Sequence, residues 1–382
     1  MDANAMVQQI AQCYAERFGG APQLYFSPGR INLIGEHVDY NDGFVMPAAI
    51  DKGAYYAVGP NGTSTIHLYS LDFEDAYSVE LSAINKTKGW PNYLLSVVNE
   101  FLLLGLPIQG FNAVLGATVP RGSGLSSSAA VEGGLAYALN DIFGLGLDRV
   151  ALAQLCQRAE HNFPGVQCGI MDQFANMMGQ KDHVFLLDCR SLAYTYYPLQ
   201  LEGYSIVLLN SGVHHSLASS QYNLRRQQCE AGLAAMGLGS FRDVQGLEHL
   251  ASLQEQMEPL VYQRCAYVVG EIARTQQAAA YLHQGDLAAF GNLMYATHAG
   301  LSQQYEVSCT ELDFLVAQAQ QDPAVIGARM MGGGFGGCTI NLVKVGGLSQ
   351  FVANACDAYQ AAFGKTPALY AVTLSDGVKR IG

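Results

Sequence analysis

A short stretch near the N-terminus, Gly29–Tyr40, crowds charged and polar residues between glycines and reads GRINLIGEHVDY. Arg30 supplies a permanent cation with five hydrogen-bond donors, which suits a phosphate or a carboxylate. Glu36, His37 and Asp39 supply the acceptors and donors that a polyol with several hydroxyls requires. A charged turn with surface ion pairs has the same composition, so both interpretations stay open for this stretch taken alone.

Small residues form a second stretch, directly before a predicted helix at Ser126–Phe143. We expect phosphate binding by a loop made of Gly122, Ser123, Gly124, Leu125, Ser126, Ser127 and Ser128. Small side chains let the backbone approach a ligand, and the first N–H groups of a helix attract an anion. A helix N-cap is the alternative, but three serines exceed what one cap needs. The loop lacks the Gly-Lys-Ser/Thr ending of a Walker A motif and the Gly-x-Ser-x-Gly spacing of a nucleophile elbow.

A third stretch, Gly332–Gly337, has five glycines in six residues. Its spacing fits Gly-x-Gly-x-x-Gly, but a strand is predicted at Cys338–Val345, where a dinucleotide-binding fold requires a helix. Each glycine costs conformational entropy on folding, so we expect the loop to pack closely against another backbone or a ligand. A purely structural turn is the alternative.

A single aspartate, Asp172, lies in the otherwise uncharged segment Cys168–Gln173. An aspartate in apolar surroundings is a candidate general base, because its neighbours can tune its pKa. A buried aspartate with a purely structural hydrogen bond would show the same pattern.

The order of the predicted elements indicates an α+β protein of two lobes. The chain has 382 residues, of which 50% are hydrophobic, enough for more than one lobe. Strands dominate the first part, helices the second, and strands return near the end. Leu24–Phe26 and Phe44–Met46 are predicted to be short strands on either side of the polar stretch, and Pro198–Gly203 is a plausible hinge between the lobes.

Charge and cysteine usage exclude several classes of protein. With 20 Lys+Arg against 32 Asp+Glu, the net charge of −12 disfavours binding to nucleic acid or to an anionic membrane. The nine cysteines contain no Cys-x-x-Cys pair, which indicates reduced thiols rather than a disulfide framework or a zinc ribbon. No signal peptide is recognised, and the longest apolar run is far shorter than a membrane span of about 20 residues. We therefore expect a soluble cytoplasmic protein.

Taken in order, the three stretches resemble those of the galactokinases, a family within the GHMP kinase superfamily. The resemblance implies two lobes: residues 1–197, similar to domain 2 of ribosomal protein S5, and residues 198–382, a ferredoxin-like lobe. It further implies ATP-dependent phosphorylation of galactose at its anomeric hydroxyl, giving galactose 1-phosphate and ADP, the first committed step of galactose catabolism. Galactose, ATP and Mg²⁺ would be its small-molecule ligands, and a monomer is expected.

The resemblance also assigns roles to individual residues. Asp172 would act on the anomeric hydroxyl, with Arg30 as the partner that keeps it ionised. The implied sugar ligands are Glu36, His37, Asp39, Asp172 and Tyr222; the implied Mg²⁺ ligands are Ser128 and Glu160, and hard oxygen donors suit that ion. The loop at Gly122–Ser128 would hold the phosphates. Trp90, the single tryptophan, resembles a residue near the adenine pocket, with a core tryptophan as the alternative.

Two departures from the family pattern and two alternative functions remain. Met331 and Val38 stand where the family commonly has threonine, and Met331 leaves open whether a hydroxyl is needed in the third stretch. One alternative is a kinase for N-acetylgalactosamine. The other is a galactokinase-like sensor that binds sugar and ATP without catalysis. The intact Ser128-Ala129 pair disfavours the sensor, because such sensors lack a Ser-Ala pair after the loop.

Overall fold

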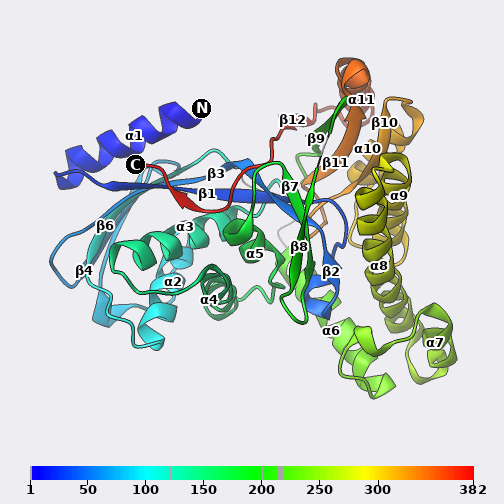
Figure 1. The fold of residues 1–382 in the computed structure, drawn as a ribbon, viewed down its shortest axis with the longest axis horizontal. Helices are drawn as coiled ribbons and strands as arrows, with labels where there is room; N and C mark the ends of the chain where they lie inside the picture. The colour runs from blue at the N-terminus through cyan, green and yellow to red at the C-terminus, as the bar shows by residue number, and fades with distance from the viewer. Residues whose placement is uncertain (1, 121, 200, 214–217) are drawn as a thin grey trace.

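The computed structural model describes residues 2–120, 122–199, 201–213 and 218–382, and it has two lobes side by side (Figure 1). The first lobe contains helices α1 (Ala3–Phe18), α2 (Pro91–Leu103), α3 (Ser127–Ile142), α4 (Arg149–Asn162) and α5 (Met171–Met178). Its strands are β1 (Gln23–Asn32), β2 (Phe44–Val45), β3 (Pro47–Pro60), β4 (Thr65–Ser70), β5 (Asp75–Glu80), β6 (Phe111–Ala117), β7 (His183–Asp188) and β8 (Tyr194–Pro198). The predicted two-lobed α+β fold is confirmed.

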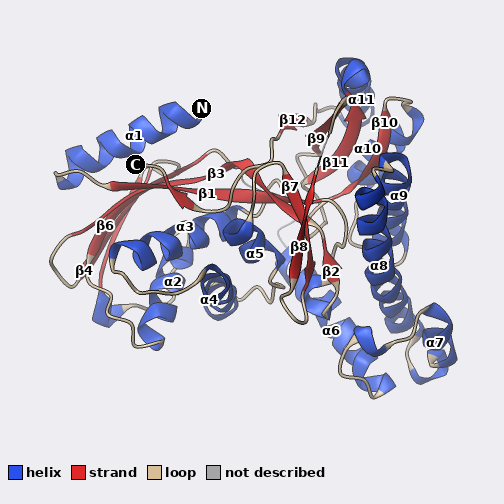
Figure 2. Cartoon of the chain, viewed as in Figure 1, coloured by secondary structure: helices blue, strands red, loops and turns tan. Residues whose placement is uncertain are grey.

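A six-stranded sheet with the order β13-β1-β3-β6-β4-β5 forms the centre of the first lobe. Helix α1 covers one face, and α2 to α5 lie on the other (Figure 2). Side chains alternate between the faces of a strand, so neighbouring residues enter different cores. Tyr25 and Tyr56 pack with the α2–α5 core, whereas Phe26 and Tyr55 pack beneath Met6, Ile10 and Tyr14 of α1.

The first strand is longer than predicted. Instead of ending at Phe26, β1 continues through Arg30 and pairs with β3, with a register shift between Pro28 and Arg30. The prediction of a polar connection was wrong here because Arg30 is buried in the strand and its charge is paired with Asp172. Bulges commonly re-aim side chains beside active sites, and this one lies at the start of the polar stretch.

The second lobe has the βαββαβ connectivity of ferredoxin-like folds. Its four-stranded sheet, with the order β10-β11-β9-β12, consists of β9 (Tyr204–Asn210), β10 (Val325–Met330), β11 (Cys338–Lys344) and β12 (Ala368–Ala371). Its helices are α6 (Ala218–Met236), α7 (Leu247–Ser252), α8 (Pro259–Gln284), α9 (Leu287–Gln303), α10 (Thr310–Gln321) and α11 (Leu348–Phe363). The helix predicted at Leu217–Ala235 is α6, except that Leu217 lies outside the described residues.

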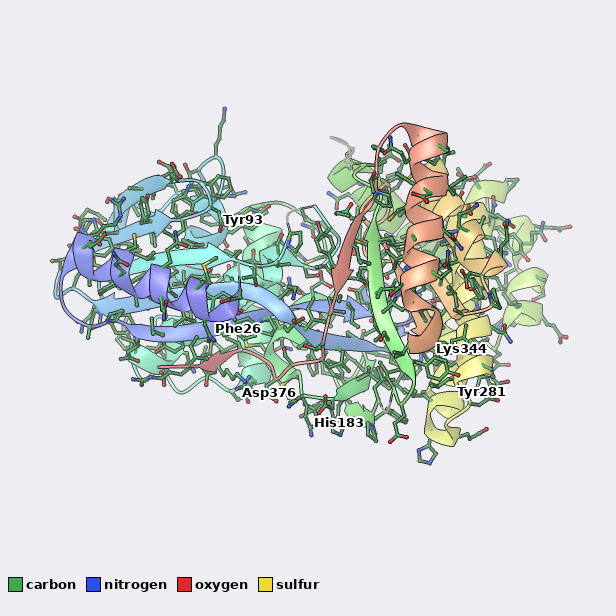
Figure 3. The ribbon with its side chains drawn as sticks, turned by 90° about the horizontal axis from the view of Figure 1, so that it is seen from above. Phe26, Tyr93, His183, Tyr281, Lys344 and Asp376 are labelled. Carbon is green, nitrogen blue, oxygen red and sulfur yellow. The ribbon has the colours of Figure 1, made fainter. Side chains whose placement is uncertain are left out.

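The chain returns to the first lobe at its C-terminus. Strand β13 (Lys379–Arg380) pairs antiparallel with β1, and Asp376 lies on the crossing segment between the lobes (Figure 3). Gly377 N donates to Gly179 O and Val378 N to Asn176 O, at the end of α5. The C-terminal segment therefore braces the helix that carries Asp172. None of the described helices has both the length and the apolar character needed to cross a bilayer.

Candidate active site

Glu36 is held from the second lobe by a buried arginine. Arg329, on β10, is fully buried, and its Nη1 lies 2.7 Å from Glu36 Oε2. Gly332 N donates to the same oxygen at 3.0 Å. Burial raises the pKa of Glu36, but Arg329 and Arg30 outweigh burial and lower it, so the side chain is a carboxylate. Sequence reasoning missed Arg329, although a charge within the apolar strand before Gly332–Gly337 was a usable signal.

A second anchor for the polar stretch comes from helix α8. Glu271 Oε1 accepts hydrogen bonds from Gly35 N at 2.9 Å and from Glu36 N at 3.3 Å. The Tyr267 hydroxyl, one turn earlier, donates to Glu36 O at 2.8 Å. Sequence reasoning also missed Glu271. The sequence signal for it was a carboxylate on the buried face of α8, beside the apolar Val268. The loop that carries Glu36 thus depends on contacts with the second lobe.

His37 lies in an aromatic cluster with both ring nitrogens engaged. Its Nε2 lies 3.2 Å from Gly333 O, and because a carbonyl only accepts, Nε2 carries the proton. Nδ1 then accepts from the Tyr40 hydroxyl at 2.8 Å, and the Tyr305 hydroxyl donates to Tyr40 at 2.8 Å. Burial lowers the pKa of His37 to about 4, so the ring is neutral. The role of His37 as a sugar-hydroxyl ligand stays a prediction, and it requires one of these bonds to break.

Asp39 and Tyr222 complete the set of predicted sugar ligands. Asp39 packs against Gly169, where a Cβ atom would lie 2.1 Å from Asp39 Oδ2, so only glycine fits there. Burial, followed by the charges of Asp172 and Glu36, raises the pKa of Asp39 to about 7. The ring of Tyr222, from α6, lies 5.2 Å from the His37 ring between centroids.

Asp172 lies in the first turn of α5, a helix that the sequence did not predict. Its Oδ1 is 2.8 Å from Arg30 Nε, and its Oδ2 accepts from Ser126 Oγ at 2.5 Å. Arg30 Nη1 also donates to Gly124 O at 2.5 Å. The candidate base, its arginine and the predicted phosphate loop therefore form one connected group.

The two predicted metal ligands are also brought together. Ser128 lies close enough to Glu160 to lower the pKa of its carboxyl, and Gln173 Nε2 donates to Glu160 Oε2 at 2.8 Å. Burial and the charge of Asp172 raise the pKa of Glu160 to about 7. The side chain of Glu160 is buried.

The acidic groups around Ser128 suit a divalent cation. Glu132, one turn after Ser128, is buried, and neither of its carboxylate oxygens has a hydrogen-bond partner. Burial, then Glu160 and Asp172, raises the pKa of Glu132 well above its usual range. No cluster of three or more metal-binding side chains occurs among the described residues. One carboxylate and one hydroxyl nevertheless suit Mg²⁺, which is commonly held by one or two carboxylates and by substrate phosphates.

The third glycine stretch packs against the predicted phosphate loop. A Cβ atom on Gly124 would lie 3.0 Å from Met331 O, and one on Gly332 would lie 3.2 Å from Gly124 O. At Gly334, where φ is +79°, a Cβ atom would lie 2.1 Å from Val307 O. The expected close backbone packing is confirmed. Met331 is buried, and its Sδ lies 3.4 Å from Asn32 N.

Two adjoining cavities are formed by these residues, and Val166 lines both. The smaller, of about 190 Å³, is lined by Arg30, Glu36, His37, Asp39, Glu160, Val166, Cys168, Met171, Asp172, Tyr222, Gly332 and Gly333. The larger, of about 610 Å³, is lined by residues that include Phe73, Trp90, Tyr93, Ser127 and Ser128. Trp90 is buried, stacks on Phe73 and donates from Nε1 to Asp75 at 3.0 Å, so it is both a core residue and part of the cavity wall. Tyr93 is marked in Figure 3.

Comparisons with known proteins identify the family. Residues 12–60 match the galactokinase galactose-binding signature, residues 92–180 the N-terminal domain of GHMP kinases and residues 278–360 their C-terminal domain. A galactokinase from Homo sapiens is 41% identical and is aligned over 98% of this chain and 96% of its own length. The chain belongs to the galactokinase family. A galactokinase from Clostridium beijerinckii is 40% identical, with 95% of each chain covered.

A solved galactokinase has almost the same fold. The Lactococcus lactis galactokinase, crystallised with galactose, superposes with a TM-score of 0.94 at 34% identity, covering 97% of this chain and 98% of that one. The family and the two-lobed fold expected from the sequence are therefore both confirmed.

Proposed function

We propose that this protein transfers the γ-phosphoryl group of ATP to the anomeric hydroxyl of galactose. The observation that carries the proposal is the position of Asp172 in the smaller cavity, bonded to Arg30 on one side and to the phosphate loop on the other. An acceptor hydroxyl in the smaller cavity would meet a phosphoryl donor in the larger one at this carboxylate. Galactokinase relatives of similar length at about 40% identity support the same reaction.

The smaller cavity suits a neutral hydroxylated ligand. Because Glu36 Oε2 is occupied by Arg329 and Gly332, its other oxygen is the one available to a sugar hydroxyl. Asp39 and Tyr222 add further polar groups to the same wall. A pocket that satisfies several hydroxyls rejects an epimer strongly, because a misplaced hydroxyl leaves buried groups unpaired.

The larger cavity suits ATP. Ser127 and Ser128 open α3 beneath it, so the first N–H groups of the helix can meet the phosphates, while Trp90 and Tyr93 offer apolar surface for the base. Ser128 and Glu160 would hold Mg²⁺, which neutralises charge on the phosphate oxygens when it is bound.

The chemistry asks mainly for positioning and charge neutralisation. In a loose phosphoryl-transfer transition state the acceptor needs little prior deprotonation, and holding the two substrates in line supplies much of the rate. Asp172 would accept the proton of the anomeric hydroxyl as the bond to phosphorus forms. Arg30 donates to that carboxylate from Nε at 2.8 Å and lies where it can stabilise charge on the transferring group.

The test is ADP release from Mg-ATP with galactose, N-acetylgalactosamine, glucose and mevalonate as separate acceptors. Release with galactose alone, abolished without Mg²⁺, is the expected result. If ADP is released faster with N-acetylgalactosamine than with galactose, N-acetylgalactosamine is the substrate instead. Galactose binding by calorimetry with no release for any acceptor would instead indicate a sensor.

We further propose that the protein is a cytoplasmic monomer. Its lobes would be residues 1–197 and 198–382, and the last strand of the second range, β13, pairs with the sheet of the first lobe. Nine free cysteines support a reducing compartment. Light scattering would test the monomer, and limited proteolysis around Pro198–Gly203 would test the boundary.

A further inference from the structure

Ser126 has an unusual backbone for a serine at the start of a helix. Its φ and ψ are 57° and 53°, in the left-handed region, and it precedes α3 without making a side-chain capping hydrogen bond. A capping serine normally has extended dihedral angles and accepts from the N–H groups of the first turn. Ser126 therefore lacks the capping hydrogen bond that usually accounts for a serine at the start of a helix.

Glycine would fit this backbone better. A side chain at positive φ brings Cβ close to the following carbonyl, whereas glycine adopts this conformation freely. Strained residues of this kind cluster at functional sites, where other contacts hold them in place. Gly122 and Gly124 of the same loop do have positive φ, at 65° and 73°. A serine with the same backbone conformation needs a reason that lies in its hydroxyl.

The hydroxyl of Ser126 instead donates a hydrogen bond to the candidate base, Asp172. Ser126 Oγ donates to Asp172 Oδ2 at 2.5 Å, while Arg30 Nε occupies Oδ1 at 2.8 Å. The backbone around Ser126 is itself fixed, because Arg30 N donates to Leu125 O at 3.1 Å and Arg30 Nη1 donates to Gly124 O. Each oxygen of Asp172 is thus held from a different direction, which fixes the plane of the carboxylate.

We propose that Ser126 is a positioning residue for Asp172 rather than a ligand of the phosphates, an inference that rests on the proposed function. The hydroxyl of Ser126 links the orientation of the base to the loop that receives the nucleotide. The other loop serines have different surroundings: Ser123 Oγ donates to Pro120 O at 2.6 Å, and Ser127 and Ser128 line the larger cavity.

The experiment measures kcat, the KM for galactose and the KM for ATP in Ser126→Gly and Ser126→Ala. Glycine removes the hydroxyl and the strain together, whereas alanine removes the hydroxyl alone. We expect kcat to fall about 10- to 100-fold in both variants, the size of a hydrogen bond to a charged group, with both KM values within about threefold. Asp182→Gly is the matched control, since Asp182 is exposed with φ of 58° and lies outside both cavities. Its kcat should equal that of the unaltered protein.

A double-mutant cycle with Asp172→Asn provides the readout that a merely structural role would not give. If Ser126 acts through Asp172, Ser126→Gly should lower kcat no further in the Asp172→Asn background. A full further loss in that background would overturn the proposal. So would unchanged kcat in both single variants, or a rise in the KM for ATP with kcat intact, which would make Ser126 a phosphate ligand.

The two proposals fail in different ways. If the unaltered protein releases no ADP with galactose, the proposed function itself is wrong. If the unaltered protein is active and Ser126→Gly matches it, only the role of Ser126 is wrong. Thermal unfolding of each variant shows whether it is folded, and we expect Ser126→Gly to unfold within a few degrees of the unaltered protein because relief of strain offsets the lost hydrogen bond.

Discussion

The smaller cavity takes its walls from both lobes, whereas the described residues that line the larger one all lie between Ser70 and Val166 in the first lobe. Tyr222, Gly332 and Gly333 are the second lobe's contribution to the smaller cavity. The glycines can lie there because they contact the first lobe through backbone alone. Changes at the boundary between the lobes should therefore affect sugar binding more than nucleotide binding.

The two cavities also differ in how their polar groups are held. In the smaller one, Glu36 is fixed by Arg329 and its backbone by Glu271, both across the lobe boundary. In the larger one, the start of α3 and the rings of Trp90 and Tyr93 would supply the surface for the proposed nucleotide. A neutral sugar offers only hydrogen bonds, so its site needs fixed partners on several sides. A nucleotide brings its own charge and an aromatic base, and one lobe suffices for these.

The largest effect that would sharpen this comparison is expected from Asp172→Asn. Loss of a general base typically lowers kcat by 10²- to 10⁴-fold, and we expect about 10³-fold with galactose binding retained. Kinetics of ADP release and calorimetry with galactose measure the two quantities separately. Turnover at the original rate by a folded Asp172→Asn protein would contradict the assigned role.

The next largest effect is expected from Arg329→Met, which breaks the contact across the lobes. It leaves the Glu36 carboxylate buried without its cation, so we expect a loss of about 3–5 kcal/mol in the free energy of unfolding. Galactose affinity should fall at least tenfold, whereas binding of a non-hydrolysable ATP analogue to the folded fraction should persist. Arg190→Met is the control, because the pair of Arg190 with Asp243 is solvent-exposed and worth less than about 1 kcal/mol. An equal loss of affinity for galactose and for the ATP analogue in Arg329→Met would contradict the proposed difference between the cavities.

A smaller effect is expected from pH through Asp39. Its pKa is raised to about 7 in the folded protein from 3.8, so folding takes up a proton between these values. Stability should therefore fall as pH rises from about 4 to about 7 and remain lower above that. Asp39→Asn removes this penalty, so its stability relative to the unaltered protein should improve by about 2–3 kcal/mol between pH 5 and pH 8, while galactose affinity drops. Denaturant unfolding at both pH values measures it, and a pH-independent difference would contradict the assignment.

The smallest effect is a spectroscopic one. Trp90 is the single tryptophan and lines only the larger cavity. An ATP analogue should change the intrinsic tryptophan fluorescence, and galactose alone should change it far less. A larger fluorescence change with galactose than with the ATP analogue would indicate that galactose binds in the larger cavity and ATP in the smaller one.

The sequence could predict those parts of the site whose composition differs from that of the surrounding chain. The crowding of Glu36, His37 and Asp39 and the small residues of the phosphate loop stand out without any structure. Their predicted roles remain to be tested. The helix predicted at Ser126–Phe143, which is α3, was likewise correct to within one residue at each end.

What could not be predicted depends on partners that are distant in the sequence. Arg329 meets Glu36 across 293 positions, and Glu271 meets Gly35 across 236, so neither pair has a local signature. Helix α5 was missed because it has only eight residues, too few for a periodic pattern. The charge of Arg30 argued for a loop, and only its pairing with Asp172 allows it inside a strand.

The return of β13 to β1 has a consequence for synthesis of the chain. The edge of β1 that pairs with β13 at Tyr25 and Phe26 is synthesised early, whereas Lys379 and Arg380 follow only after the whole second lobe. At about 5–20 residues per second, roughly 20–70 s separate the two. During that interval the first sheet has an unpaired edge, the kind of surface that attracts other strands. The first lobe can be completed only after the second lobe has been synthesised, so its final assembly depends on a segment made after its neighbour.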